Sequence, residues 1–266
     1  MVTMNKIDKK ILELKDQGRM GLMTHLVVGF PSIEKTISYA RIMEDSGADF
    51  IELQIPFSDP IADGPTIMNA CDLALSNGTK VSNAIETMKI LSNELSIPLL
   101  FMAYYNNIFK YGLERFCKDS RAAGASGLIV PDIPIEEEPN EHFIKTAEKN
   151  NLYPIRVLSP ASTLERIRKN SRVAKGFIYC TARQGITGVR NEMDPKTVSY
   201  LNSVKREINV PIAVGFGISS REHILSLSKH ADIAVVGSAI INVINKDYSK
   251  AEAKIAEFVR SLLLDT

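Results

Sequence analysis

The side chains best suited to acid–base chemistry gather in residues 51–65, IELQIPFSDPIADGP. Glu52 stands inside an apolar run, and Asp59 and Asp63 follow it in a loop rich in proline and glycine. Burial disfavours a carboxylate, so Glu52 is tied to a neighbouring Arg or Lys, faces water at a strand edge, or has a raised pKa suited to proton donation. Asp63 supplies a second carboxylate for such chemistry, although Asp63 before Gly64 also fits an N-cap that opens a helix.

Glycine-bearing turns later in the chain are candidates for a phosphate site. Residues 186–188, 215–219 and 237–238 each follow an apolar run. Glycine lets backbone N–H groups approach an anion, and a helix N-terminus stabilises the negative charge. The alternative is that these glycines only make tight turns. Residues 181–191, TARQGITGVRN, form a long polar stretch that suits a mobile lid over a site.

Aromatic side chains at strand ends could form the wall of a pocket for a flat ring. Tyr104, Tyr179 and Phe216 occupy such positions. Ordinary core packing is the alternative for each. A buried tyrosine hydroxyl needs a hydrogen-bond partner, which favours a pocket role for the two tyrosines.

The elements that must position these residues repeat eight times. Short, nearly continuous apolar runs, typical of strands buried on both faces of a parallel sheet, begin near Gly21, Asp49, Ile97, Ser126, Tyr153, Lys175, Pro211 and Ala231. Amphipathic stretches separate them and predict helices over 33–46, 81–95, 113–122, 138–150, 163–169, 195–208, 219–229 and 249–264. The predicted N-caps are Ser32, Ser82, Ser162, Asp194 and Ser219 or Ser220.

Eight such units without a Pro/Gly/Ser-rich linker predict one (β/α)8 TIM barrel over residues 1–266. A doubly wound open sheet is the rival, but eight evenly spaced units favour closure. An extra N-terminal helix near residues 7–15 is expected to cover the N-terminal face. Active sites of such barrels lie at the C-terminal ends of the strands, so polar residues there are the functional candidates.

Composition narrows the function classes. The 32 basic and 31 acidic residues give a net charge of +1, which argues against a nucleic-acid or membrane-surface binder. Three widely spaced cysteines, no signal-like N-terminus and no apolar run of about 20 residues indicate a cytoplasmic protein. The four histidines are dispersed, so no metal site is expected. Lys175 starts a strand, which is the wrong end for a Schiff-base lysine.

The motifs together resemble those of the tryptophan synthase alpha-subunit family. PFSDP and ADGP in residues 51–65 carry the resemblance, with VVGFPS, GFIYCTARQGITG, VGFGIS and VGSAII in the family's order over nearly the whole chain. The resemblance implies a lyase of tryptophan biosynthesis that cleaves indole-3-glycerol phosphate to indole and glyceraldehyde 3-phosphate by a retro-aldol reaction.

The same resemblance implies roles for individual residues. Glu52 matches the family's general acid/base and Asp63 its second catalytic carboxylate. The implied phosphate contacts are Gly188, Gly217, Gly237 and Ser238, the implied pocket residues are Tyr104 and Tyr179, and Thr187 is the loop residue that bonds Asp63 on closure. Three positions depart from the family pattern. Gln54 stands where glycine is common, His25 where a large apolar group is common, and Pro131 where a smaller residue precedes the Asp at position 132. We assign His25 no catalytic role from the sequence.

The resemblance also implies a partner. Family members pair with a pyridoxal-phosphate-dependent beta subunit that consumes the indole, in an alpha2-beta2 heterotetramer, so this chain itself is expected to carry no cofactor. The docking surface is expected around the mouth, at residues 56–60, Asp132 and residues 159–161. The rival interpretations are a regulatory subunit that keeps the barrel without its chemistry, and another phosphate-binding barrel enzyme.

Overall fold

Eight parallel strands close into a barrel in a computed structural model that describes residues 4–181, 193–215 and 217–264. They run in chain order around the barrel, and β1 closes it by pairing with β8, with Gly21 opposite Ile233. The strands are β1 Gly21–Val27, β2 Phe50–Gln54, β3 Leu99–Met102, β4 Gly127–Ile129, β5 Tyr153–Leu158, β6 Ile178–Thr181, β7 Ile212–Gly215 and β8 Ile233–Val236. The predicted TIM barrel is confirmed.

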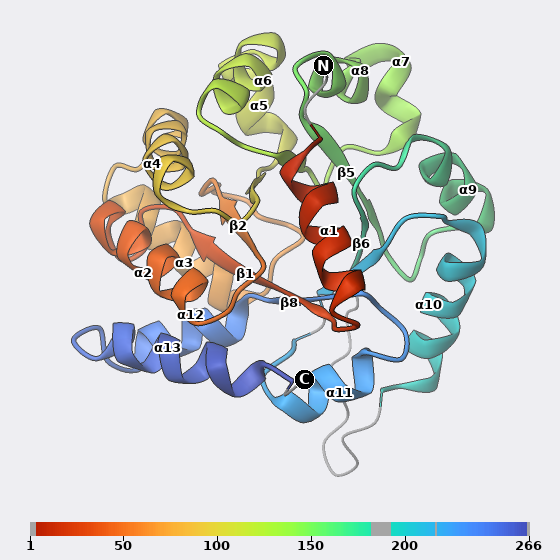
Figure 1. Cartoon of the computed structure of the whole chain (residues 1–266). Helices are drawn as coiled ribbons and strands as arrows, with labels where there is room; N and C mark the ends of the chain where they lie inside the picture. The colour runs from red at the N-terminus through yellow and green to blue at the C-terminus, as the bar shows by residue number, and fades with distance from the viewer. Residues whose placement is uncertain (1–3, 182–192, 216, 265–266) are drawn as a thin grey trace.

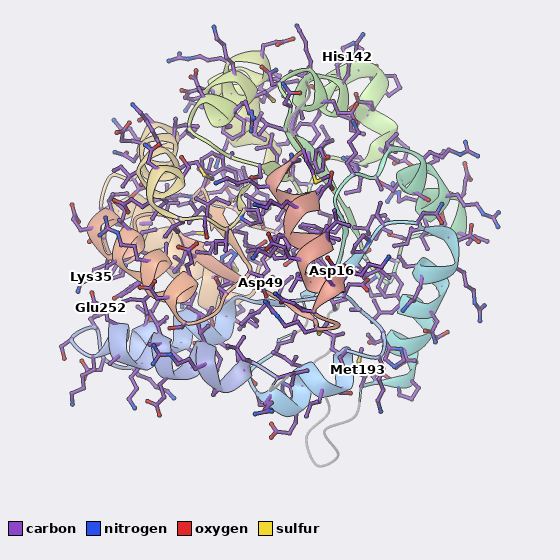
Figure 2. The ribbon with its side chains drawn as sticks, viewed as in Figure 1. Asp16, Lys35, Asp49, His142, Met193 and Glu252 are labelled. Carbon is purple, nitrogen blue, oxygen red and sulfur yellow. The ribbon has the colours of Figure 1, made fainter. Side chains whose placement is uncertain are left out.

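Helices surround this barrel as an outer ring (Figure 1). The described helices are α1 Lys6–Asp16, α2 Ile33–Asp45, α3 Pro65–Ser76, α4 Val81–Glu94, α5 Tyr105–Tyr111, α6 Leu113–Ala122, η1 Ile135–Glu137, α7 Glu138–Glu141, α8 Phe143–Lys149, α9 Leu164–Val173, α10 Pro195–Glu207, α11 Arg221–Leu227, α12 Ser238–Lys246 and α13 Ala251–Leu262. Ion pairs join neighbours in the ring, as between Lys35 of α2 and Glu252 of α13, whose Nζ and Oε1 lie 3.0 Å apart (Figure 2).

The extra N-terminal helix exists and lies across one end of the barrel (Figure 1). Asn5 caps it by accepting from the Ile7 backbone N–H, and its side-chain amide also donates to the Ser126 carbonyl at the start of the fourth strand unit. Ile7 and Leu14 are buried in the apolar cluster inside the barrel. α1 therefore closes the N-terminal end, as the sequence predicted.

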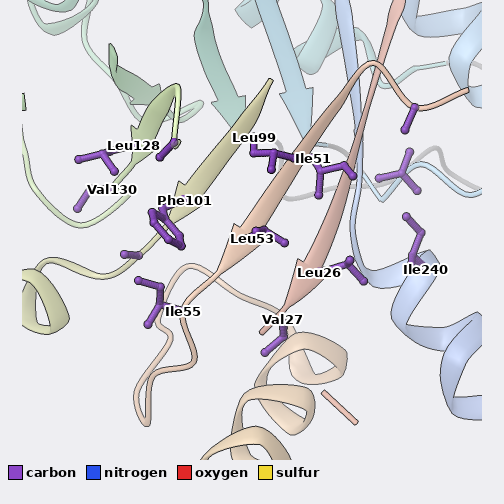
Figure 3. Packing of buried hydrophobic residues seen from close by; sticks show 14 of the residues in the cluster. Leu26, Val27, Ile51, Leu53, Ile55, Leu99, Phe101, Leu128, Val130 and Ile240 are labelled. Atoms are coloured by element: carbon purple, nitrogen blue, oxygen red, sulfur yellow. The ribbon is translucent and has the colours of Figure 1, made fainter. Parts of the chain in front are cut away.

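Two apolar clusters reflect the two faces of every strand. Met23, Phe50 and Phe177 belong to the inner cluster. Ile51 and Leu53 point the other way and belong to the larger cluster between strands and helices (Figure 3). Because successive side chains of a strand alternate between faces, Glu52 must point into the barrel between these two outward residues.

Polar residues at strand starts are structural here. Asp49, just before β2, accepts two hydrogen bonds from the Arg19 guanidinium, at 2.6 and 2.8 Å, and one from the Leu22 backbone N–H (Figure 2). Lys175, before β6, pairs with Glu148 at 3.1 Å. Both arrangements fit the prediction that chemistry is confined to the opposite end of the barrel.

Several details of the helix prediction were wrong. The stretch 138–150 is not one helix, because His142 adopts a left-handed conformation with φ of 54° and separates α7 from α8. Three helices, α3, α5 and α12, were not predicted, since they sit in loops where site residues interrupt the apolar period. Ser82 and Ser162 are not N-caps; Lys80 and Thr163 precede those helices instead.

Candidate active site

A cavity of about 880 Å³ opens at the C-terminal ends of the strands. Predicted site residues that line it are Glu52, Asp63, Tyr179, Gly217, Gly237 and Ser238. Tyr104 lies behind this lining and contacts Asp63 directly. Thr187, Gly188 and Phe216 lie outside the described residues, as does most of the 181–191 stretch predicted as a lid.

Glu52 is held by a partner that the sequence analysis did not assign. Its side chain is 4% exposed, and its Oε1 lies 2.7 Å from Nδ1 of His25, on the neighbouring strand. The strand register sets this contact, since His25 stands directly opposite Glu52 in the β1–β2 pairing. Oε2 of Glu52 is buried and has no hydrogen-bond partner within the described structure. Of the predicted alternatives, a solvent-facing carboxylate is excluded by this burial, and no lysine or arginine among the described residues pairs with Glu52.

His25 is as buried as its partner, at 3% side-chain exposure. Burial alone lowers the pKa of an imidazole, but the hydrogen bond and negative charge of Glu52, the charge of Asp63 and the side chain of Gln54 outweigh it. The pKa of His25 is therefore raised above its ordinary 6.5. Pairing each polar residue of one strand with its neighbour in register would have identified this partner.

Asp63 lies in the loop between β2 and α3, and two side chains hold it. Its Oδ2 accepts hydrogen bonds from Nε2 of Gln54, at 2.7 Å, and from the hydroxyl of Tyr104, at 2.9 Å. The alternative role as an N-cap is excluded, because Gly64 is the N-cap of α3 and no side chain caps that helix. The Asp63 carboxylate is thus aimed at the cavity wall and not at the helix start.

Tyr104 couples this carboxylate to the surrounding loop. Its hydroxyl donates to Asp63 and accepts from the Ala62 backbone N–H at 2.9 Å. Its ring stacks on Phe57, with centroids 5.2 Å apart. Burial and then the negative charge of Asp63 raise the pKa of Tyr104, so the phenol stays protonated and remains a donor.

Tyr179 faces the cavity from β6, on the far side from Asp63. Burial, followed by the charges of Glu52 and Asp63, raises its pKa well above 10.0. Gly215 on β7 makes room for this ring, because a Cβ at that position would lie 2.7 Å from the Tyr179 hydroxyl oxygen. A neutral, hydroxyl-bearing ring therefore forms one wall of the site.

Glycines form the opposite rim. Gly237 is the N-cap of α12, and Ser238 is the first residue of that helix, so backbone N–H groups of its first turn face the cavity. Gly217 adopts φ of +63°, and a Cβ there would meet no described atom within 4 Å. A Cβ on Gly237 would lie 3.5 Å from the Cβ of His25. The glycine rim and the carboxylate side are therefore parts of one mouth, with the N-terminus of α12 on one side.

Arg156, a buried cation at the rim of the cavity, was also not identified from the sequence. Arg156 of β5 is 4% exposed; its Nε donates to Asn170 at 2.9 Å and its Nη2 to the Ile133 carbonyl at 3.2 Å. Burial lowers its pKa to about 10, against the opposing charges of Glu138 and Glu136. These contacts tie the loop after β4 to α9.

The described residues offer neither a metal site nor a lysine placed for Schiff-base chemistry. No group of three or more His, Cys, Asp or Glu side chains there is arranged to hold a metal ion. No lysine lines the cavity in the part of the chain that the structure describes. The described helices are all too short or too polar to span a membrane.

Comparison with known proteins agrees with the geometry. The family model described as tryptophan synthase alpha chain matches residues 11–263. The chain is 41% identical over 261 residues to a tryptophan synthase alpha chain of Thermoanaerobacter sp. (strain X514), covering 97% of this chain and 98% of that one. It is 41% identical over 256 residues to that of Desulfotalea psychrophila, covering 96% and 99%.

Solved structures give the same result. The alpha subunit of tryptophan synthase from Legionella pneumophila superposes with a TM-score of 0.89 at 30% identity, covering 98% of this chain and 97% of that one. A chain of tryptophan synthase from M. tuberculosis superposes with a TM-score of 0.86 at 26% identity, covering 98% and 100%. The resemblance drawn from the motifs is confirmed, and the chain belongs to the tryptophan synthase alpha chain family, a family of lyases.

Proposed function

We propose that the chain cleaves indole-3-glycerol phosphate to indole and glyceraldehyde 3-phosphate in tryptophan biosynthesis. The observation that carries this proposal is that Glu52, Asp63 and the glycine rim at Gly237 line the same cavity. Such a cavity suits a substrate with a flat ring at one end and a phosphate at the other.

The reaction explains why two carboxylates are needed. Protonation of the indole carbon that bears the side chain makes the ring a leaving group, and a base must take the proton of the glycerol hydroxyl as the aldehyde forms. We assign both proton transfers to Glu52, because its Oε2 is buried at the cavity and has no other described partner. The cationic ring that forms in between requires a negative charge near its nitrogen, and Asp63 supplies it.

The remaining predicted residues bind the substrate. Gly217, Gly237 and Ser238 hold the phosphate through backbone N–H groups and the α12 N-terminus, joined by Gly188. Tyr104 and Tyr179 form the wall for the ring, with Phe216 as a further contact. Thr187 bonds Asp63 when the loop closes. These assignments rest on the family resemblance and on the position of the described residues around the cavity.

We further propose that the chain works in the cytoplasm with a pyridoxal-phosphate-dependent beta subunit, in an alpha2-beta2 assembly. Indole is apolar and crosses membranes, so direct transfer between subunits prevents its loss. The mouth is the docking surface, through residues 56–60, Asp132 and residues 159–161. In the described loop, Ile61 is 79% exposed beside this surface, as expected for an apolar contact awaiting a partner.

An indole-release assay, with and without the beta partner, tests the proposal. The native chain should release indole from indole-3-glycerol phosphate, faster with the partner present. Glu52→Gln should reduce turnover at least about 100-fold, the usual scale for loss of a general acid–base group. The matched control is Glu94→Gln, which removes a surface partner of Arg41 and should leave turnover unchanged. No indole release by the native chain even with the partner would reject the proposed reaction.

A further inference from the structure

Each of the two carboxylates is held by a buried polar side chain. His25 holds Glu52 through the 2.7 Å contact between Oε1 and Nδ1. Gln54 donates its Nε2 to Asp63 at 2.7 Å. The remaining polar atoms of these two side chains, Nε2 of His25 and Oε1 of Gln54, are both buried and complete no hydrogen bond in the described structure.

The orientation of the Gln54 amide follows from Asp63. A carboxylate only accepts hydrogen bonds, so the amide nitrogen must face Asp63 and the amide oxygen is left for another donor. The Gln54 side chain acts on His25, whose pKa it helps to raise. A proton on Nε2 of His25 would therefore satisfy both unpaired atoms at once.

Nδ1 of His25 thus faces a carboxylate, and the amide oxygen of Gln54, whose side chain acts on His25, is the acceptor available to Nε2. A neutral imidazole has one donor and one acceptor, whereas an imidazolium has two donors. We propose that His25 is a positioning residue that works as an imidazolium, donating Nδ1–H to Glu52 and Nε2–H to Gln54, and so joins Glu52 and Asp63 into one hydrogen-bonded array.

The surroundings of His25 support a positive charge. The groups that raise its pKa are Glu52, from β2, Asp63, from the following loop, and Gln54; no basic side chain is among the described groups that act on it. Gly237, which carries no charge, lies beside His25, since a Cβ there would be 3.5 Å from Cγ of the His25 ring. A buried cation with two carboxylates nearby meets the requirement that buried charges be paired.

The proposal rests on the proposed function and defines how Glu52 meets its substrate. With Oε1 fixed by the imidazolium, Glu52 presents Oε2 as a carboxylate. Oε2 takes the proton of the glycerol hydroxyl and delivers it to the ring carbon. The C–C bond then breaks, the hydroxyl oxygen becomes the aldehyde oxygen, and the electrons of the broken bond return to the ring. One proton moves, and the protonation of His25 is the same before and after.

NMR of the histidine ring nitrogens tests the inference without any substrate. The ring signals of His25 are assigned by their loss in His25→Asn. In the native chain at pH 6.5, the ordinary pKa of an imidazole, His25 should give the signature of an imidazolium, with both nitrogens protonated. In Glu52→Gln, whose fold is checked by circular dichroism, burial should dominate and His25 should become neutral. A neutral His25 ring in the native chain, or an imidazolium unaffected by Glu52→Gln, would overturn the inference.

The pH profile of turnover supplies a second readout. Native turnover should fall as the pH rises through the raised pKa of His25. His25→Asn keeps a hydrogen-bond donor near Oε1 of Glu52 but cannot titrate, so the fall of turnover at high pH should disappear. If His25 had a merely structural role, this fall would remain in the variant. His142→Asn is the matched control, because the left-handed conformation of His142, away from the cavity lining, tolerates Asn, and it should leave the profile unchanged.

The two proposals can fail separately. An imidazolium at His25 in a chain that releases no indole with its partner would reject the proposed reaction alone. A neutral His25 in a chain that releases indole would reject this inference alone.

Discussion

The two ends of the barrel use glycine in opposite ways. At the N-terminal end, glycines make room for α1: a Cβ on Gly176 would lie 2.9 Å from Ile7, and one on Gly21 2.7 Å from Leu14. At the C-terminal end, a Cβ on Gly217 would meet no described atom within 4 Å, and one on Gly237 would make only ordinary contacts. Gly21 and Gly176 at the closed end thus permit packing, whereas Gly217 and Gly237 at the open end leave backbone N–H groups accessible.

The polar groups differ in the same way. At the closed end, Asp49 is fully engaged by Arg19 and by a backbone N–H. At the open end, buried polar atoms of Glu52, His25 and Gln54 lack partners in the described structure. Unsatisfied buried polar atoms cost stability. Others occur elsewhere in the described structure, on Tyr39, Ser46, Thr87, Ser120 and Tyr200, but of all these residues only Glu52 and His25 line the cavity, where a substrate could pair with them. Substitutions at the two ends should therefore separate stability from activity.

The largest effect is expected from Asp63→Asn at the open end. The substitution would keep the shape of the side chain but remove the charge that stabilises a cationic ring. Loss of one such electrostatic partner should reduce kcat/KM by about 10²–10³. Indole release measures the loss, and urea unfolding should show stability close to that of the native chain. Activity within about threefold of the native value would contradict the role assigned to Asp63.

Ile7→Ala at the closed end should lower stability and leave activity unchanged. Ile7 is fully buried inside the barrel, and its truncation leaves a cavity that should lower the free energy of unfolding by about 2–5 kcal/mol. Turnover of the folded protein should stay unchanged, because no group at the cavity moves. The check is urea unfolding beside the indole assay. A large loss of kcat in protein that is demonstrably folded would break the comparison between the ends.

A pair of glycine substitutions sharpens the comparison between the two ends of the barrel. Gly237→Ala should raise KM about tenfold, equivalent to about 1.4 kcal/mol of binding, because the methyl group crowds the phosphate. Its stability should change little, since the nearest described atoms would be 3.5 Å away. Gly176→Ala should destabilise by about 1–3 kcal/mol, because of the close contact with Ile7 and φ of +67°, and leave KM unchanged. Equal effects on KM from both variants would contradict a phosphate site at Gly237.

The smallest effect is a pH dependence of stability at His25. Because the folded-state pKa of His25 is raised above 6.5, its contribution to stability is complete below 6.5 and is lost as the pH rises through the folded-state value. The stability difference between the native chain and His25→Asn should therefore shrink as the pH increases. Urea unfolding at a series of pH values measures it, and a difference that grows with pH would contradict the sign.

The barrel could be predicted from the sequence because each strand is an apolar run bounded by polar residues, and such runs repeat. Glu52 could be identified for a related reason, since charged residues inside an apolar strand are rare, whereas Asp63, in a loop, was singled out by the family resemblance. Helices α3, α5 and α12 could not be found by periodicity, because at these positions the chain places cavity residues such as Asp63 and Gly237 close to helix starts.

The partners of the site residues were harder to predict than the residues themselves. That Glu52 meets His25 depends on the register of β1 and β2, and the apolar pattern allows several registers when a strand is buried on both faces. Gln54 stood out only as a departure from the family pattern, because its bond to Asp63 depends on how the loop after β2 folds back. Long-range register and loop closure are therefore what the sequence left undetermined.

The most direct test of the account is a structure of the chain soaked with indole-3-propanol phosphate, an uncleavable analogue of the proposed substrate. The account predicts one bound molecule, with its ring between Glu52 and Asp63 and its phosphate at the Gly237 and Ser238 backbone. A phosphate bound elsewhere, or a ring that contacts neither carboxylate, would contradict the claim that the two sides of the mouth serve a single substrate.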